Sequence, residues 1–219
     1  MWPPRKPRPR PSDPAGGARR RRLAPPRPLP PMTRDDPLAL GRRAGLPPDL
    51  MWLLEKHPRE SWEGALGETG RFWLARHAMF REAQAALLAE TRGFAAGGAD
   101  PVRFGHRFQR IAGFLLGELE THHMVEDHHY FPRLARAEPR LQRGFDLLDA
   151  DHHALHDALE RTAADANALL RALSGGGRDA AGRMTETLEA LARLLDRHLA
   201  DEEDIVAPVL IEHGERGLG

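Results

Sequence analysis

The stretch ADPVRFGHRFQRIAGFLLGELETHHMVEDHHYFP, residues 99–132, predicts one long helix that ends in a dense group of titratable side chains. Asp100 is a residue type that caps helix N-termini, and Pro101 suits the first helical position, where an N–H would have no partner. The last eleven residues hold four histidines and two acids. This end of the helix is either a polar face rich in histidine or a site that needs nitrogen and oxygen ligands together.

The rest of the chain predicts more helices. Beyond residue 31 there are only four valines and three isoleucines, while Ala, Leu, Glu and Arg dominate, a composition that favours helix over strand. We expect further long helices at roughly 68–92, from near 139 to 174, and from about 179 to the region of Pro208, and a short helix in LPPDLMWLLEKHP, residues 46–58. The predicted core residues are Phe72, Trp73, Phe80, Phe108, Phe114, Leu115, Leu119, Phe131, Leu188, Leu191 and Leu195.

These elements predict an all-α protein whose residues 68–213 form an up-down-up-down four-helix bundle. Residues 32–67 would be an extension that carries the short helix. Residues 1–31 hold eleven prolines and nine basic groups against one acid, which predicts a disordered arm. The arm could bind anionic surfaces, but the favoured alternative is that the protein starts at Met32 and the arm is not translated.

The composition also argues against several classes of protein. Residues 32–219 carry 23 basic and 31 acidic groups, a net charge of −8, which argues against nucleic-acid binding. The chain has no cysteine, so disulfides and thiolate metal sites are excluded. Because no apolar run reaches about 18 residues, we expect no membrane-spanning helix. With no export signal recognised, the expected location is cytoplasmic.

The histidine-rich segment has a counterpart later in the chain. HHMVEDHHYFP, residues 122–132, and HLADEEDIVAP, residues 198–208, share His at the first position, Glu four positions later and Pro ten positions later. His77 precedes His122 by 45 residues, and His152 precedes His198 by 46. Two segments that agree in internal pattern and in spacing indicate a duplicated helical hairpin.

Helical geometry brings the repeated residues together. Residues four positions apart lie on one face of a helix, which pairs His122 with Glu126, His198 with Glu202 and His152 with His156. In an up-down bundle these faces fall at one level of the core. The candidate ligands are His77, His122, Glu126, His152, His156, His198 and Glu202. Burying them without partners would cost several kcal/mol each, so two divalent cations are expected, of iron, manganese or zinc.

This pattern resembles the hemerythrin-like proteins with an HHE cation-binding domain, and the resemblance covers about residues 68–211. It implies two non-haem iron ions, bridged by carboxylates and an oxo group, that bind dioxygen reversibly. The resemblance therefore favours iron over manganese or zinc. By resemblance, His77 and His122 would hold the iron that keeps an open position. The residues that saturate the other iron would be His152, His156 and His198.

The bridging acids follow from the same resemblance. Glu126 would be one bridge, and the other would come from the last helix. Oxygen carriers of the family place that acid five residues after the histidine, which here is Glu203, whereas the helical face and the internal repeat favour Glu202. We choose Glu202 and keep Glu203 as the alternative.

The remaining histidines and acids receive smaller roles. His129 is a candidate for a supporting or replacement ligand, while His123, His128 and His153 are expected to be surface residues or partners of nearby acids. Asp149 shares the face of His152 and could orient its ring.

The expected function is binding of dioxygen, peroxide or nitric oxide for storage, sensing or detoxification. The alternatives are a di-iron enzyme with peroxidase, catalase-like or nitric-oxide-reducing activity, and an iron- or oxygen-responsive regulatory module. Glu-x-x-His pairs, typical of ferritin-like carboxylate enzymes, are missing. A histidine-rich ligand set also stabilises reversible binding better than high-valent oxygen activation, which places carriage or sensing slightly ahead of catalysis. The sequence does not predict the oligomeric state.

Overall fold

The structure, a computed structural model, describes residues 36–215, so the predicted disordered arm lies outside the described residues. Within this part of the chain there are α-helices, short 3-10 turns and one π-helical turn, and no strand, which confirms the all-α prediction. None of the described helices is long and apolar enough to cross a membrane.

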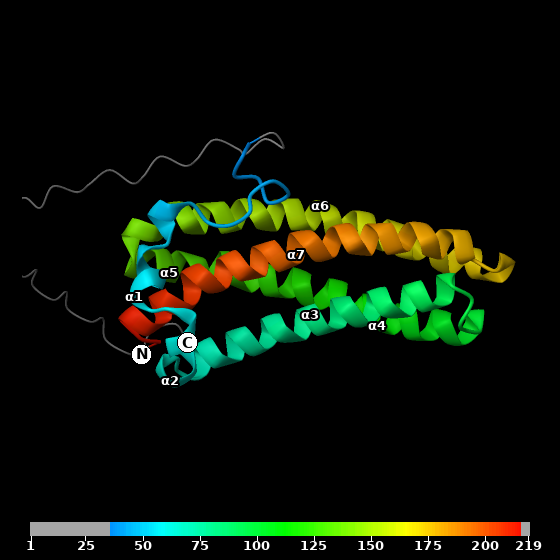
Figure 1. The fold of residues 1–219 in the computed structure, drawn as a ribbon, viewed down its shortest axis with the longest axis horizontal. Coiled ribbons are helices and arrows are strands. Elements are labelled where there is room, and N and C mark those ends of the chain that lie inside the picture. The colour runs from blue at the N-terminus through cyan, green and yellow to red at the C-terminus, as the bar shows by residue number, and fades with distance from the viewer. Residues whose placement is uncertain (1–35, 216–219) are drawn as a thin grey trace, which may run out of the picture.

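Four long helices make up the body of the protein: α3 (Glu68–Ala95), α4 (Pro101–Val125), α6 (Gln142–Ala172) and α7 (Arg178–His213). They lie along the long axis, and helices that follow one another in the chain run in opposite directions (Figure 1). The Asp100 side chain accepts hydrogen bonds from the backbone N–H groups of Val102 and Arg103, as expected for an N-cap.

Two of the long helices differ from their predicted ends. The chain does not leave the helical conformation at Phe131 but passes through a π-helical turn, Glu126–Tyr130, into α5 (Phe131–Ala137). In that turn the backbone N–H of Phe131 donates to the carbonyl of Glu126, five residues back. The last helix continues through Pro208 and ends before Gly214, whose φ of 74° suits glycine.

The core consists of two apolar clusters separated along the bundle. One cluster, around Phe80, Leu115 and Leu188, fills the bundle toward the α3–α4 connection. The other, around Trp73, Phe131 and Ile205, fills the end where α5 lies. On α3 His77 falls between Trp73 of the second apolar cluster and Phe80 of the first apolar cluster, so a polar layer is enclosed between two water-excluding regions.

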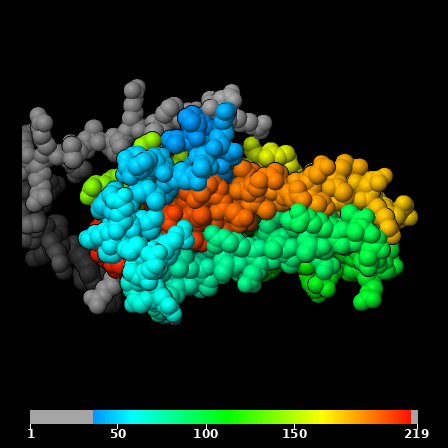
Figure 2. All heavy atoms as spheres, viewed as in Figure 1, coloured from blue at the N-terminus to red at the C-terminus, as the bar shows by residue number. Residues whose placement is uncertain are grey.

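Residues 36–66 lie against the bundle as an extension. It contains 3-10 turns at Pro48–Leu50 and Arg59–Ser61, the short helix α1 (Trp52–Lys56) and a second one, α2 (Trp62–Ala65), which the sequence analysis did not predict. Leu50, Leu53 and Trp62 are buried in the second apolar cluster. Figure 2 shows this blue and cyan segment spread over one end of the bundle and over α7.

Two predicted core residues are exposed instead. Phe72 is 64% exposed and Phe114 is 44% exposed. Each directly precedes a buried residue, Trp73 and Leu115, and a step of one residue turns a helix by about 100°. Only one member of each pair can therefore point into the core.

Candidate metal centre

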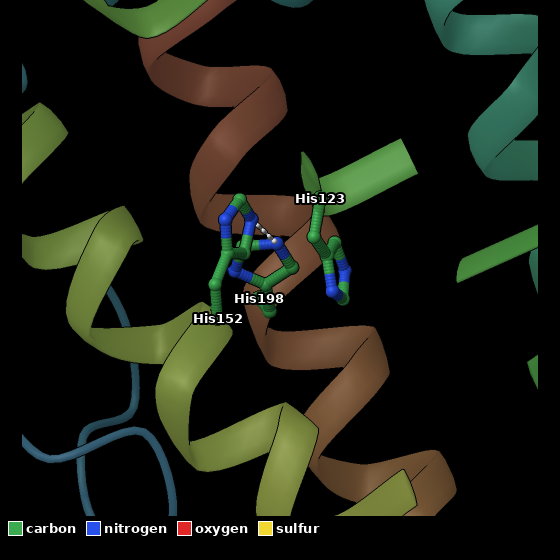
Figure 3. A group of neighbouring side chains, drawn as sticks. All are labelled: His123, His152 and His198. Carbon is green, nitrogen blue, oxygen red and sulfur yellow. Dashed lines mark hydrogen bonds between the residues drawn. The ribbon is translucent and has the colours of Figure 1, made fainter. Parts of the chain in front are cut away.

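The polar layer contains two clusters of side chains with metal-ligand chemistry. In each cluster one ligand-type atom from every residue lies within 4.8 Å of the others. The first cluster is His77, His122, Glu126 and Glu202, and the second is His123, His152 and His198. In the first, Nε2 of His77 lies 3.1 Å from Nε2 of His122. In the second, Nε2 of His152 lies 3.1 Å from Nε2 of His198 (Figure 3).

The buried carboxylate of Glu202 reaches both clusters. Its Oε2 lies 3.5 Å from Nε2 of His77 and 3.4 Å from Nε2 of His198. The Trp73 Nε1–H group donates a 2.6 Å hydrogen bond to Oε1, which holds the carboxylate in place. Glu203 lies outside the clusters, where it accepts from Arg81 at 2.8 Å and lies 3.1 Å from Nδ1 of His77.

Glu126 is the second buried carboxylate between the clusters. Its Oε1 lies 2.9 Å from Nε2 of His122, and its Oε2 lies 3.6 Å from Nε2 of His152. Burial, and next the neighbouring Glu202 carboxylate, raise the pKa of Glu126 well above its usual range. Two carboxylates this close repel one another when both are ionised, and a cation between them would remove that repulsion.

Carboxylates outside the clusters orient three of the rings through Nδ1. His77 is backed by Glu203, His152 by Asp127 at 2.7 Å, and His198 by Asp151 at 3.4 Å. Such contacts fix the ring so that Nε2 faces the cluster, as is usual for metal-binding histidines.

The prediction that Asp149 orients His152 is wrong, because Asp149 lies at the surface beside His153. It precedes His152 by three residues on α6, whereas Asp127 approaches from the π-helical turn of the neighbouring helix.

The pKa values of the buried histidines differ with their partners. Burial lowers the pKa of His198, but contacts with Asp151 and Glu202 outweigh it and raise the value to about 9. For His122, burial is the largest cause and lowers the pKa to about 3. Burial also lowers the pKa of His123, with nearby His152 as the next cause. The layer therefore mixes neutral imidazoles with charged groups.

Several polar atoms in this layer make no hydrogen bond of suitable geometry with any residue that the structure describes, even where a nitrogen lies close by. They are Nε2 of His123, both carboxylate oxygens of Glu126 and Oε2 of Glu202. Unpartnered buried polar atoms are rare because each costs free energy. Here they belong to imidazole and carboxylate groups that lie within the two clusters, a donor set that fits divalent iron, manganese or zinc.

The structure does not bring every predicted residue to this layer. The prediction that His156 shares the core face of His152 is wrong: its side chain is 56% exposed and lies 3.3 Å from Glu160. His129 is exposed as well. It follows the start of the π-helical turn, which winds more slowly per residue than an α-helix and carries His129 off the face of His122.

His123 takes the place that was expected for His156. The prediction of a surface position for His123 is wrong, since the residue is buried and its ring stacks on His152 with centroids 4.2 Å apart. Consecutive residues of a helix point about 100° apart, so His122 and His123 can serve partners on either side of α4. The histidine doublet at 122–123 was the signal that could have indicated this.

A bundle with imidazoles and carboxylates facing inward from its helices is a class of protein that holds metal ions in its core. The family model described as the hemerythrin HHE cation-binding domain matches residues 70–210. The chain belongs to this family, which confirms the resemblance seen in its motifs. Searches of curated proteins and of solved structures gave no match.

Proposed function

We propose that the two clusters hold a pair of non-haem iron ions and that the centre binds dioxygen, peroxide or nitric oxide for storage, sensing or detoxification. The observation that carries the proposal is a set of buried potential metal-ligand atoms on Glu126, Glu202 and His123 that make no hydrogen bond with the described residues. One iron would lie among His77, His122 and the two carboxylates, and the other among His123, His152 and His198 with the same carboxylates.

The two clusters offer unequal numbers of ligands, which supports small-ligand binding at the first cluster. The first cluster offers two imidazoles and the second offers three, while Glu126 and Glu202 serve both. An iron ion in the first cluster would keep a coordination position available for the small ligand. The family resemblance assigns the open position to the same half, through His77 and His122.

A cavity adjoins this half of the centre. It has a volume of about 180 Å³ and is lined by Phe72, Trp73, Arg76, Thr121, His122, Val125, Glu126 and Tyr130. The aromatic and aliphatic side chains in its wall would favour a small uncharged molecule. Trp73 both lines the cavity and holds Glu202, and Tyr130 packs against Trp73 with ring centroids 4.7 Å apart.

The test is a visible spectrum of the protein loaded with ferrous iron without air, then exposed to air and finally purged with nitrogen. A band that appears in air and disappears on purging supports reversible binding. Bleaching that is not reversed, together with turnover of added peroxide, would show an enzyme instead. Absence of any ligand-dependent band with dioxygen, peroxide and nitric oxide would contradict the proposed function.

A further inference from the structure

We propose that the extension, residues 36–66, is a functional part of the metal centre, with Arg43 as a positioning residue for His198; the inference rests on the proposed function. The family match begins at residue 70, so the extension lies outside it. Charged side chains of the extension nevertheless contact residues beside both metal-ligand clusters.

Arg43 enters the bundle from the extension and is enclosed there, with its side chain only 2% exposed. Its Nη1 donates to Oδ1 of Asp151 at 2.7 Å, and its Nη2 pairs with Oδ2 of the same carboxylate. Its Nε donates to Asp201 at 2.8 Å, and Nη1 also donates to the carbonyl of Leu38 at 2.9 Å. All three nitrogen atoms of the guanidinium are therefore used.

The carboxylate that Arg43 holds is the one that backs a candidate ligand. Oδ2 of Asp151 lies 3.4 Å from Nδ1 of His198, and Nε2 of His198 faces the second cluster. Asp151 precedes His152 and Asp201 precedes Glu202, so Arg43 joins α6 and α7 beside their candidate ligands. A bidentate guanidinium–carboxylate contact fixes the plane of the carboxylate, and the carboxylate in turn fixes the orientation of the imidazole ring.

The charge of Arg43 matters as well as its shape. Asp151 and Asp201 are fully buried and face the cationic side chains of Arg43 and Arg197, so the four charges balance. Without Arg43, an uncompensated negative charge would lie beside His198. That charge would stabilise the ferric over the ferrous state of an iron held there and lower its midpoint potential.

The other cluster has a similar but more exposed contact. Arg59 of the extension lies 3.2 Å from Glu203, whose other oxygen lies 3.1 Å from Nδ1 of His77. The Arg59 side chain is 45% exposed, and Arg81 of α3 pairs with the same carboxylate. Loss of Arg59 should therefore change the rate of metal loss and the midpoint potential less than loss of Arg43.

The test compares variants of the full chain loaded with iron. Arg43→Gln should speed metal loss to a chelator by about 10- to 100-fold and lower the midpoint potential. Arg43→Lys keeps the charge without the planar fork, so it should restore much of the potential but little of the slow metal loss. Arg59→Gln should change both by less.

A matched control comes from another contact of the same extension with α7. Lys56 pairs with Glu212 at 2.7 Å at the surface, ten residues beyond the candidate ligand Glu202 on α7. Lys56→Ala should leave the rate of metal loss and the potential unchanged. Equal effects of Lys56→Ala and Arg43→Gln would mean that docking of the extension matters only for stability, and would overturn the proposal.

A measurement on the unaltered protein guards against variants that fail to fold. Amide hydrogen exchange in residues 38–50 should slow when iron binds, because the metal and the docked extension stabilise the same arrangement of Asp151 and His198. Exchange that is identical with and without iron would overturn the proposal. Absence of metal from the unaltered chain would overturn the proposed function, whereas normal metal loss and potential in folded Arg43→Gln would overturn this inference alone.

Discussion

The α3–α4 half and the α6–α7 half of the centre come from similar sequence patterns but differ in composition. The first cluster combines two histidines with carboxylates and adjoins a cavity of about 180 Å³. The second presents three histidines and adjoins a larger groove of about 600 Å³ lined in part by His153 and His156. A duplicated sequence therefore need not give two equal sites, because the adjacent residues His122 and His123 of α4 belong to different clusters.

The largest effect is expected from the carboxylate that joins the two halves. Glu202→Gln should lower the iron content from two ions per chain to one or fewer, because Glu202 is the acid of α7 that reaches both His77 and His198. Elemental analysis of reconstituted protein measures this. Glu203→Gln is the comparison and should lower the iron content much less, because it changes only the contact behind Nδ1 of His77 and leaves both shared carboxylates in place. The reverse order of effects would contradict the assignment of Glu202.

The next effect separates the halves. His123→Ala should weaken iron binding in the second half while the first half keeps all of its ligands, because the second half loses one of its three imidazoles. His156→Ala removes an exposed ring and should leave both ions in place. Iron content and the visible spectrum distinguish the two variants. A loss of iron in His156→Ala equal to that in His123→Ala would contradict the assignment of His123 to the second half.

The pH dependence should follow the histidines that carry protons in the metal-free protein. The pKa of His198 is raised from 6.5 to about 9, so metal must displace a proton, and the affinity of the second half should rise by up to about tenfold per pH unit across this range. The same raised pKa stabilises the metal-free fold fully below pH 6.5, and this stabilisation is lost as the pH rises through about 9.

Titration of iron binding between pH 6 and 9 checks the sign. Asp151→Asn removes a cause of the raised pKa of His198 and should flatten the dependence for the second half only. An affinity that falls as the pH rises would contradict the account.

The smallest effect concerns access to the first half. Phe72 lines the cavity and is 64% exposed, so Phe72→Ala should widen the entrance and raise the rate of small-ligand binding by a few-fold, about 1 kcal/mol or less in the barrier. Met124 lines the groove on the other side, and Met124→Ala should leave the rate unchanged. Stopped-flow absorbance measures both; a faster rate in Met124→Ala would place entry in the groove.

Local features of the fold could be predicted from the sequence. The cap at Asp100 and the four long helices depend on short-range patterns, and the helical spacing from His198 to Glu202 placed both residues in the polar layer. That His123 and not His156 lies in the polar layer could not be predicted from one helix alone. It depends on how far α4 and α6 are rotated about their axes, which packing decides.

Long-range contacts were beyond the reach of these patterns. Arg43 and Asp151 are 108 residues apart, and no motif links an arginine of the extension to an aspartate of α6. The π-helical turn was missed for a different reason: HHMVEDHHYFP fits an ordinary helix, and the slower winding is seen only in the hydrogen bond from Phe131 to Glu126.

The central claim is a pair of iron ions in two unequal environments, and a Mössbauer spectrum of the protein loaded with ⁵⁷Fe tests it most directly. The account predicts two quadrupole doublets of equal area, one from the half with His77 and His122 and one from the half with His123, His152 and His198. Addition of a small ligand should shift the first far more than the second. A single doublet, or iron bound at one ion per chain, would contradict the account.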